Sequence, residues 1–376
     1  MSTLYFHIPF CKQACHYCDF HFSTVQKTYR PVMDAMFREL EIQRDYLNDK
    51  NLTSIYFGGG TPSLLQETDL NRFLELSQTY FAVLPDAEIT LEANPDDLTH
   101  AALKTFLKAG INRLSIGTQS FFDADLRLMN RAHSASDAES SIKRAQDAGF
   151  DNITIDLIYG MPGSDIRQWQ QNVEMALSLQ VKHLSAYALT VEPHTALAKK
   201  VQIGEIALLD EEEVAKQYHL LCDHMKLSGF DHYELSNFGK PEFYSRHNTS
   251  YWNGTPYLGI GPSAHSFDGL TRQWNIANNT QYGKQLTAGN AWYEWEELEE
   301  SDRFNEYLMT GLRTAKGISL TTIDTRFGDY RSNKLMQDAQ NYLECGRLQL
   351  DDDRIFIPEQ EWLISDRIIS DLFWVQ

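Results

Sequence analysis

The sequence has no long apolar run and comparatively few basic residues. No uninterrupted apolar stretch approaches the roughly 20 residues that a membrane-spanning helix needs. Lysine and arginine together number 33 against 52 aspartates and glutamates, which gives a net charge of −19. This balance argues against a nucleic-acid groove and against electrostatic attraction to anionic lipid. We therefore expect no nucleic-acid partner.

Targeting and phosphate-binding patterns are missing as well. The N-terminal residues show no basic segment followed by an apolar one, so we expect no signal peptide and a cytoplasmic location. The glycines of the segment 57–62 do not form GxGxxG, and no GKS or GKT follows, so phosphate binding is not indicated. The 376 residues, 42% hydrophobic and 23% charged, suit a globular chain with one large domain and a smaller one.

Cysteine is scarce and unevenly distributed. Of the five cysteines, Cys11, Cys15 and Cys18 lie within eight residues of each other. In a reducing compartment such a group is more typical of metal binding than of disulfides. Cys222 shares one helical face with apolar neighbours, so we interpret it as a buried core thiol. Cys345 falls at an expected helix end and is interpreted as structural.

The spacing C-x3-C-x2-C of the clustered cysteines predicts an iron–sulfur centre. Thiolates are the usual ligands of such clusters, and three of them on a [4Fe–4S] cubane leave one iron open. The amino and carboxylate groups of S-adenosylmethionine (SAM) can chelate that iron, and electron transfer from the cluster then releases a 5′-deoxyadenosyl radical. The alternative is zinc, because His7, His16 and His21 lie close by and Cys3His zinc sites exist.

The first two-thirds of the chain alternates between strand-like and helical patterns. We predict strands at Leu4–Ile8, Ser54–Phe57, Glu88–Glu92, Arg113–Gly117, Asn152–Ile158 and His183–Ala186. Predicted helices cover Tyr29–Leu47, Thr68–Phe81, Thr99–Ala109, Ala135–Ala148, Arg167–Leu179 and Glu211–Leu227. Six such units predict an α/β fold, a partial (β/α)6 TIM-type barrel, with an open doubly wound sheet as the alternative.

The last third has a different character. Residues 230–290 are rich in Gly, Asn, Tyr and Trp and are expected to form loops and short strands over the barrel. Glu294–Asp302 is strongly acidic and is interpreted as a solvated linker or helix start. The helices and hairpin expected after it predict a small α+β domain that resembles a winged helix. We thus divide the chain into a barrel (1–230), an accessory region (231–295) and a C-terminal domain (296–376).

Polar residues stand at the ends of the later predicted strands. Glu92, Gln119 and Asp156 each follow an apolar run, and active sites of barrels form at the carboxyl ends of strands. A carboxylate there can bind a ribose diol or an amino group, and an amide can bind adenine. Arg131 could pair with a ligand carboxylate. Each of these could instead be a turn or cap residue, but beside a cluster they favour a SAM pocket.

The ordered motifs resemble those of the oxygen-independent coproporphyrinogen III oxidase group of radical SAM proteins. The motifs are Tyr-x-His-Ile-Pro-Phe-Cys-x3-Cys-x-Tyr-Cys, Gly-Gly-Gly-Thr-Pro-Ser, Glu-x-Asn-Pro, Ser-Ile-Gly-x-Gln-Ser-Phe and Asp-Leu-Ile-Tyr-Gly-Met-Pro, and they cover nearly the whole chain. The resemblance implies cluster ligation by Cys11, Cys15 and Cys18. It also implies SAM contacts from Tyr5, Tyr17, Gly59, Gly60, Thr61, Glu92, Gln119, Arg131 and Asp156.

Two departures point to a subgroup, the HemW heme chaperones. The oxidase carries a further cysteine where this chain has Phe20. The N-terminal segment before its cysteine motif is also longer than the one in this sequence. Residues 246–252 match the HNxxYW motif of the chaperones, which is associated with heme. His247 would then be a heme ligand, with Tyr251 and Trp252 packing on the porphyrin. His265 is a second candidate ligand, and Arg246 could pair with a propionate.

The resemblance implies a protein of porphyrin metabolism that binds heme and passes it to acceptor hemoproteins of respiration. Its cofactors would be a [4Fe–4S] cluster, SAM and heme, with an unidentified reductant as partner. The resemblance also implies dimerisation and peripheral membrane contact. The alternative is an oxygen-independent coproporphyrinogen III dehydrogenase, which converts propionates to vinyl groups by oxidative decarboxylation. For a heme chaperone, we assign no catalytic residue.

Overall fold

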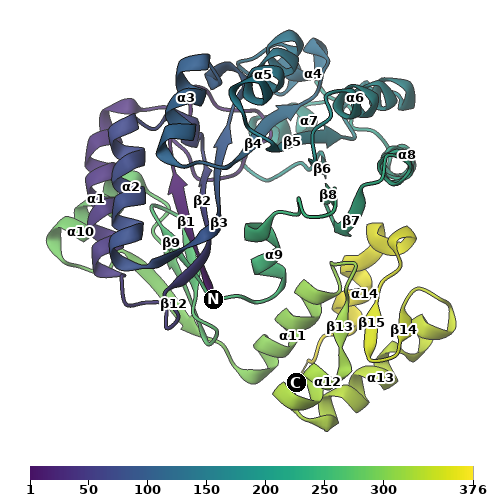
Figure 1. The fold of residues 1–376 in the computed structure, drawn as a ribbon. Helices are drawn as coiled ribbons and strands as arrows, with labels where there is room; N and C mark the ends of the chain where they lie inside the picture. The colour runs from purple at the N-terminus through teal and green to yellow at the C-terminus, as the bar shows by residue number, and fades with distance from the viewer. Residues whose placement is uncertain (376) are drawn as a thin grey trace.

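The computed structural model of the protein describes residues 1–375, and its core is a parallel sheet (Figure 1). Strands β1 to β6 follow one another in space in their chain order. They span Ser2–Ile8, Asn51–Gly59, Ala82–Ala93, Arg113–Gln119, Asn152–Tyr159 and His183–Ala188. The connecting helices α1 to α6 span Tyr29–Ile42, Glu67–Tyr80, His100–Ala109, Asp123–Leu128, Ala135–Ala148 and Ile166–Ser178. The predicted partial barrel of six βα units is confirmed.

The strands form here because their alternate residues are apolar and pack beneath the helices. In β1, Leu4, Phe6 and Ile8 line one face and are fully buried. Thr3 and His7 lie on the opposite face, which is buried but polar. Capping residues set where the helices begin. Helix α5, for example, begins with a capping box between Ser134 and Asp137. No helix within residues 1–375 is long and apolar enough to cross a membrane.

The sheet does not stop at β6 but continues at both edges to twelve strands. On the β1 side it adds β9 (Tyr257–Ile260), β10 (His265–Phe267), β11 (Thr271–Asn275) and β12 (Tyr293–Glu297), and on the β6 side β8 (Asn237–Gly239) and β7 (Asp231–Glu234). Residues 230–290 therefore do contain the expected short strands, but these extend the sheet, where we expected loops and short strands laid over the barrel. These strands have three to five residues each, too few to show a clear alternating pattern.

Four further helices complete this part of the chain. They are α7 (Ala196–Gln202), α8 (Glu211–Leu227), α9 (Arg246–Trp252) and α10 (Asn279–Ala288). Helix α10 packs against α1 at the left of Figure 1, whereas α9 stands near the centre of the molecule, between the sheet and the C-terminal domain.

A buried carboxylate fastens the extension to the barrel. Glu39 of α1 accepts hydrogen bonds from the Trp292 indole (2.9 Å), the Asn275 amide (2.6 Å), the Gly261 backbone (2.8 Å) and the Tyr282 hydroxyl. Burial raises the pKa of Glu39 to about 7, and the donors oppose that shift. A buried charge is tolerated only with such partners. The group thereby fastens β11, α10 and the segments next to β9 and β12 to helix α1.

The C-terminal domain is separate in the ribbon and lies at the lower right of Figure 1. It contains α11 (Glu300–Gly311), α12 (Leu320–Phe327), α13 (Asp329–Glu344), a 3-10 helix η4 (Glu359–Ile364) and α14 (Ser365–Asp371). A small sheet has the order β13 (Ile318–Ser319), β15 (Arg354–Phe356), β14 (Gln349–Asp351). The expected helices and hairpin are present, while α12 and β13 were not predicted. The interpretation of Glu294–Asp302 as a linker or helix start is wrong for its first residues, which belong to β12. Its last residues do begin α11.

Candidate functional site

A cavity of about 520 Å³ opens at the carboxyl ends of the parallel strands, and we call it the cysteine cavity. It is lined by all three clustered cysteines. Eight of the predicted SAM contacts line it too: Tyr17, Gly59, Gly60, Thr61, Glu92, Gln119, Arg131 and Asp156. Tyr5 does not, since it lines a neighbouring cavity instead. The fold thus brings together predicted site residues that are up to 145 positions apart in the sequence, from Cys11 to Asp156.

The cysteine loop is held by hydrogen bonds to the end of α4. The His16 ring donates from Nδ1 to the Leu128 carbonyl (2.7 Å), and the Gln13 amide donates to the Asn130 carbonyl (2.6 Å). Asn130 returns a bond from its amide to the Ala14 carbonyl (2.7 Å). His16 therefore serves as an anchor for the loop.

The donor set fits a cluster better than one ion. Within residues 1–375, the three sulfur atoms do not all lie within 4.8 Å of one another, as ligands of a single shared ion would. Ligands of a cubane bind separate irons and stand further apart. Donors already point at the sulfurs: Thr61 Oγ1 lies 3.4 Å from Cys11 Sγ, and Arg131 Nη1 lies 3.3 Å from Cys15 Sγ. Such hydrogen bonds stabilise bound thiolates.

Two buried carboxyl groups face the cysteine cavity. Glu92 accepts hydrogen bonds from the Tyr56 hydroxyl (2.7 Å) and the Gly59 backbone (3.2 Å). Burial raises the pKa of Glu92 to about 7 and that of Asp156 to about 6. Each carboxyl group retains acceptor capacity, so the pair can receive an ammonium group or a diol.

Arg131 and Gln119 complete the wall. Arg131 donates from Nη2 to the Asn94 amide oxygen (2.6 Å) and to the Gly117 carbonyl (2.8 Å). Its buried Nε has no protein partner in the part of the chain that the structure describes. Gln119 has a φ of +65°, a strained backbone for a residue with a side chain. Such strain is retained where the surrounding structure fixes the residue, often at a functional site.

The glycine turn after β2 is needed for packing, and Gly60 gives a direct prediction. A Cβ added at Gly60 would lie 2.8 Å from the carbonyl oxygens of Ile8 and Phe10, which are backbone atoms and cannot move aside. We expect Gly60→Ala to lower the free energy of unfolding by about 1–3 kcal/mol, the usual cost of overpacking. Gly283 in α10 is the matched control, because its nearest neighbour is 3.8 Å away. Denaturant unfolding of both variants checks this, and equal stability would contradict it.

A second cavity, of about 710 Å³, lies beside the first, and we call it the aromatic cavity. The two share Asp19, Phe20, Gly59 and Glu92. Its walls carry aromatic rings from the barrel side and from the C-terminal domain: Tyr5, Tyr251, Tyr257, Phe267 and Tyr307. Arg272, Arg303 and Arg326 also line it, and so does the exposed His265.

The predicted heme residues do not share one surface. His247 is 1% exposed, and both ring nitrogens are engaged, Nδ1 with the Ser54 hydroxyl (2.8 Å) and Nε2 with the Tyr251 hydroxyl (3.0 Å). Tyr251 lines the aromatic cavity, whereas Trp252 lines a different one between the barrel and the C-terminal domain. Arg246 pairs with Asp86 (3.0 Å). His265, in contrast, makes no side-chain hydrogen bond within residues 1–375.

Several lining residues were not predicted. Asn94, Ser115 and Tyr187 line the cysteine cavity. Asn94 and Ser115 could have been found, since each lies close to a predicted strand end. Arg303 and Tyr307 reach the aromatic cavity from α11, and their sequence pattern is that of an ordinary amphipathic helix.

Comparisons with known proteins agree with this geometry. The family model for the radical SAM superfamily matches residues 5–176, and that for the HemN C-terminal domain matches residues 298–364. The solved structure of coproporphyrinogen III oxidase (HemN) from Escherichia coli superposes with a TM-score of 0.85 over 99% of this chain and 90% of that chain, at 23% identity. These matches define a radical SAM protein with a HemN-type C-terminal domain.

Curated relatives narrow the class. The heme chaperone HemW of Bacillus subtilis is 32% identical over 98% of both chains. HemW of Lactococcus lactis is 35% identical over 87% of this chain and 85% of its own. A mitochondrial radical S-adenosyl methionine domain-containing protein 1, from Mus musculus, is 34% identical over 85% of this chain and 74% of its own. The chain belongs to the HemW family of heme chaperones.

Proposed function

We propose that this protein binds heme in the aromatic cavity and delivers it to acceptor hemoproteins, with a [4Fe–4S] cluster and SAM in the cysteine cavity. The observation that carries the proposal is the adjacency of the two cavities, one with three cysteines and one with aromatic walls and an uncommitted imidazole. Family membership supports the heme assignment. The proposal includes the division of the chain into three parts at residues 230 and 295, because heme would lie between all three.

In the cysteine cavity, Cys11, Cys15 and Cys18 would hold the cluster, which when reduced supplies an electron to SAM. Glu92 and the glycine turn would receive the SAM amino group, because a buried carboxylate and exposed backbone acceptors suit an ammonium. Asp156 would accept from the ribose hydroxyls. Arg131 would stabilise charge at Cys15 and leaves its Nε for a further acceptor.

In the aromatic cavity, heme would find flat apolar walls and cations for its propionates. The volume falls in the range of about 300–1,000 Å³ that is typical of cofactor sites. Tyr251, Tyr257 and Phe267 offer rings for stacking. The buried Nε of Arg303 has no hydrogen-bond partner among residues 1–375, so its guanidinium is available to a carboxylate.

Within the proposal, His265 would be the heme ligand and His247 a positioning residue. Burial and the nearby Arg272 lower the pKa of His265, so its imidazole is neutral and able to bind iron at neutral pH. His247 would have to give up its hydrogen bonds to Ser54 or Tyr251 before it could do so. We therefore infer that His247 acts by holding Tyr251 at the wall of the cavity.

Acceptor hemoproteins, an unidentified reductant, dimerisation and peripheral membrane contact belong to the proposal through family resemblance. The rival activity, coproporphyrinogen III dehydrogenation, is tested directly. The protein is reconstituted without oxygen and supplied with SAM, a reductant and coproporphyrinogen III. We expect no protoporphyrinogen, while heme added to the same sample is bound. Turnover of coproporphyrinogen would overturn the chaperone proposal.

A further inference from the structure

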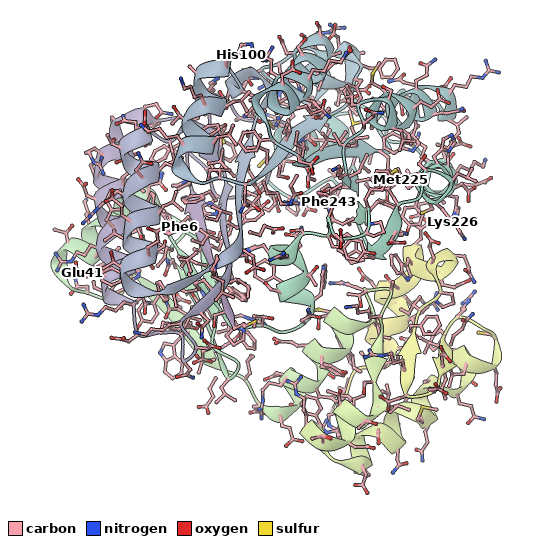
Figure 2. All side chains as sticks on the ribbon, viewed as in Figure 1. Phe6, Glu41, His100, Met225, Lys226 and Phe243 are labelled. Atoms are coloured by element: carbon pink, nitrogen blue, oxygen red, sulfur yellow. The ribbon has the colours of Figure 1, made fainter. Side chains whose placement is uncertain are left out.

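A third cavity, of about 600 Å³, separates the barrel from the C-terminal domain and takes no part in the proposed function. Its barrel side is formed by α8 and β7, and its other side by β15, η4 and the chain between them. Figure 1 shows α8 and β7 directly above the C-terminal domain, and Figure 2 labels Met225 and Lys226 on α8 at this border. We call this space the interdomain cavity.

Three metal-ligating side chains meet in the interdomain cavity. Cys222 of α8, His232 of β7 and Glu359 of η4 offer one sulfur, one nitrogen and one oxygen atom, all within 4.8 Å of one another. Nδ1 of His232 lies 2.8 Å from Glu359 Oε1 and 3.8 Å from Cys222 Sγ. It is the only such group among residues 1–375.

The imidazole of His232 is fixed in the orientation that a metal ligand needs. Its Nε2 lies 3.3 Å from the Leu235 carbonyl, which is placed to accept a hydrogen bond from it. Phe238 stacks on the ring at 4.0 Å, and Trp362 contacts it edge-on at 4.3 Å, both between centroids. Ligating histidines commonly donate their other nitrogen to a carbonyl in this way. Nδ1 is left to face the carboxylate and the thiol.

A cation can take the place of a proton between these donors. Nδ1 of His232 lies 2.8 Å from Glu359 Oε1, a distance that a single hydrogen bond fits, and both atoms offer lone pairs to an ion once that proton is displaced. The buried Tyr218 hydroxyl lies beside the Cys222 thiol. It could donate to a water on the cation.

We propose that Cys222, His232 and Glu359 bind one zinc ion that joins the barrel to the C-terminal domain, with a fourth position open to the interdomain cavity. One thiolate, one imidazole and one carboxylate are all ordinary zinc ligands, and three protein ligands with an open position form a common site. The mixed set of sulfur, nitrogen and oxygen excludes magnesium and calcium as preferred ions. The ion binds in place of the thiol proton, which is released to solvent.

The test uses the full chain with its cluster in place, so that Cys11, Cys15 and Cys18 are occupied. The protein is dialysed against a chelator, checked for iron and sulfide, and titrated with zinc chloride. We expect about one zinc per chain, and zinc-edge X-ray absorption should show one sulfur neighbour at about 2.3 Å and lighter atoms at about 2.0 Å. Glu359→Gln and Cys222→Ser should each weaken zinc binding by at least about tenfold.

Cys345→Ser is the matched control, since Cys345 is exposed and is not one of the three proposed ligands, and the variant should bind zinc as the parent does. Glu359→Gln keeps the shape of an already part-exposed side chain, so its folding is not at risk, and unchanged cluster iron confirms that the variant is intact. Absence of zinc binding, zinc without a sulfur neighbour, or zinc with three sulfur neighbours would each overturn the proposal. The first would leave His232 hydrogen-bonded to Glu359 with no ion between them, and the last would place zinc on the cluster cysteines.

Discussion

Cys15→Ala is expected to abolish the iron–sulfur centre. The parent protein, reconstituted without oxygen, should hold about four irons and four sulfides per chain, and the variant should hold almost none. Cys15 is the cysteine that Arg131 contacts, so its loss removes both a ligand and the group that neutralises the arginine. Iron and sulfide analysis, together with the visible absorption of the cluster, measures the effect.

The same variant should lose specific SAM binding, because the open iron disappears with the cluster. Cys345→Ala controls for the loss of any thiol, since Cys345 is exposed at the end of α13 and donates only to the Tyr342 carbonyl. It should retain full iron and sulfide. If Cys15→Ala also retained both, the ligand assignment of the three cysteines would be wrong.

His265→Ala is expected to weaken heme binding by about tenfold or more and to shift the Soret band, because an axial ligand is removed. His247→Ala should have a smaller effect on affinity and leave the Soret position unchanged, since His247 acts through Tyr251. Titrations of heme into both variants, followed by absorption, separate a ligand from a positioning residue.

The histidine comparison has a built-in control and a clear contrary result. His100 is exposed at the first turn of α3, and His100→Ala should bind heme as the parent does. A Soret shift in His247→Ala without one in His265→Ala would restore His247 as the ligand and exclude the assignment of His265. In the parent, the affinity for heme should be constant at neutral pH and above. It should fall only at acidic pH, because the pKa of His265 is lowered and its imidazole becomes protonated only there.

The barrel and its cysteine cavity were predictable because their signals are local. The strands are short segments rich in apolar and β-branched residues, and the helix Ala135–Ala148 was predicted to the residue because Ser134 caps it and Gly149 ends it. The polar residues at strand ends meet because parallel strands point their carboxyl ends the same way. Buried Cys222 was also predicted, and its solvent exposure is 8%.

The aromatic cavity was not predictable, because it depends on how distant segments pack. The HNxxYW segment reads as a single motif, yet on α9 its residues face different surroundings, with His247 inside the barrel and Tyr251 at the cavity. The strands β9 to β12 are too short to be recognised from the sequence. Without them the position of His265 could not be predicted. Nothing in the sequence around Glu359 indicates that it meets Cys222 and His232.

Transfer of bound heme is the measurement that tests the central claim most directly. The protein is loaded with heme, freed of excess heme, and mixed with an apo-hemoprotein whose holo form has a distinct spectrum. We predict that heme passes to the acceptor in near-stoichiometric amount, and that the loaded His265→Ala variant, which holds less heme, delivers correspondingly less. Heme that stays on the protein, or transfer no different from that of heme on serum albumin, would contradict the account.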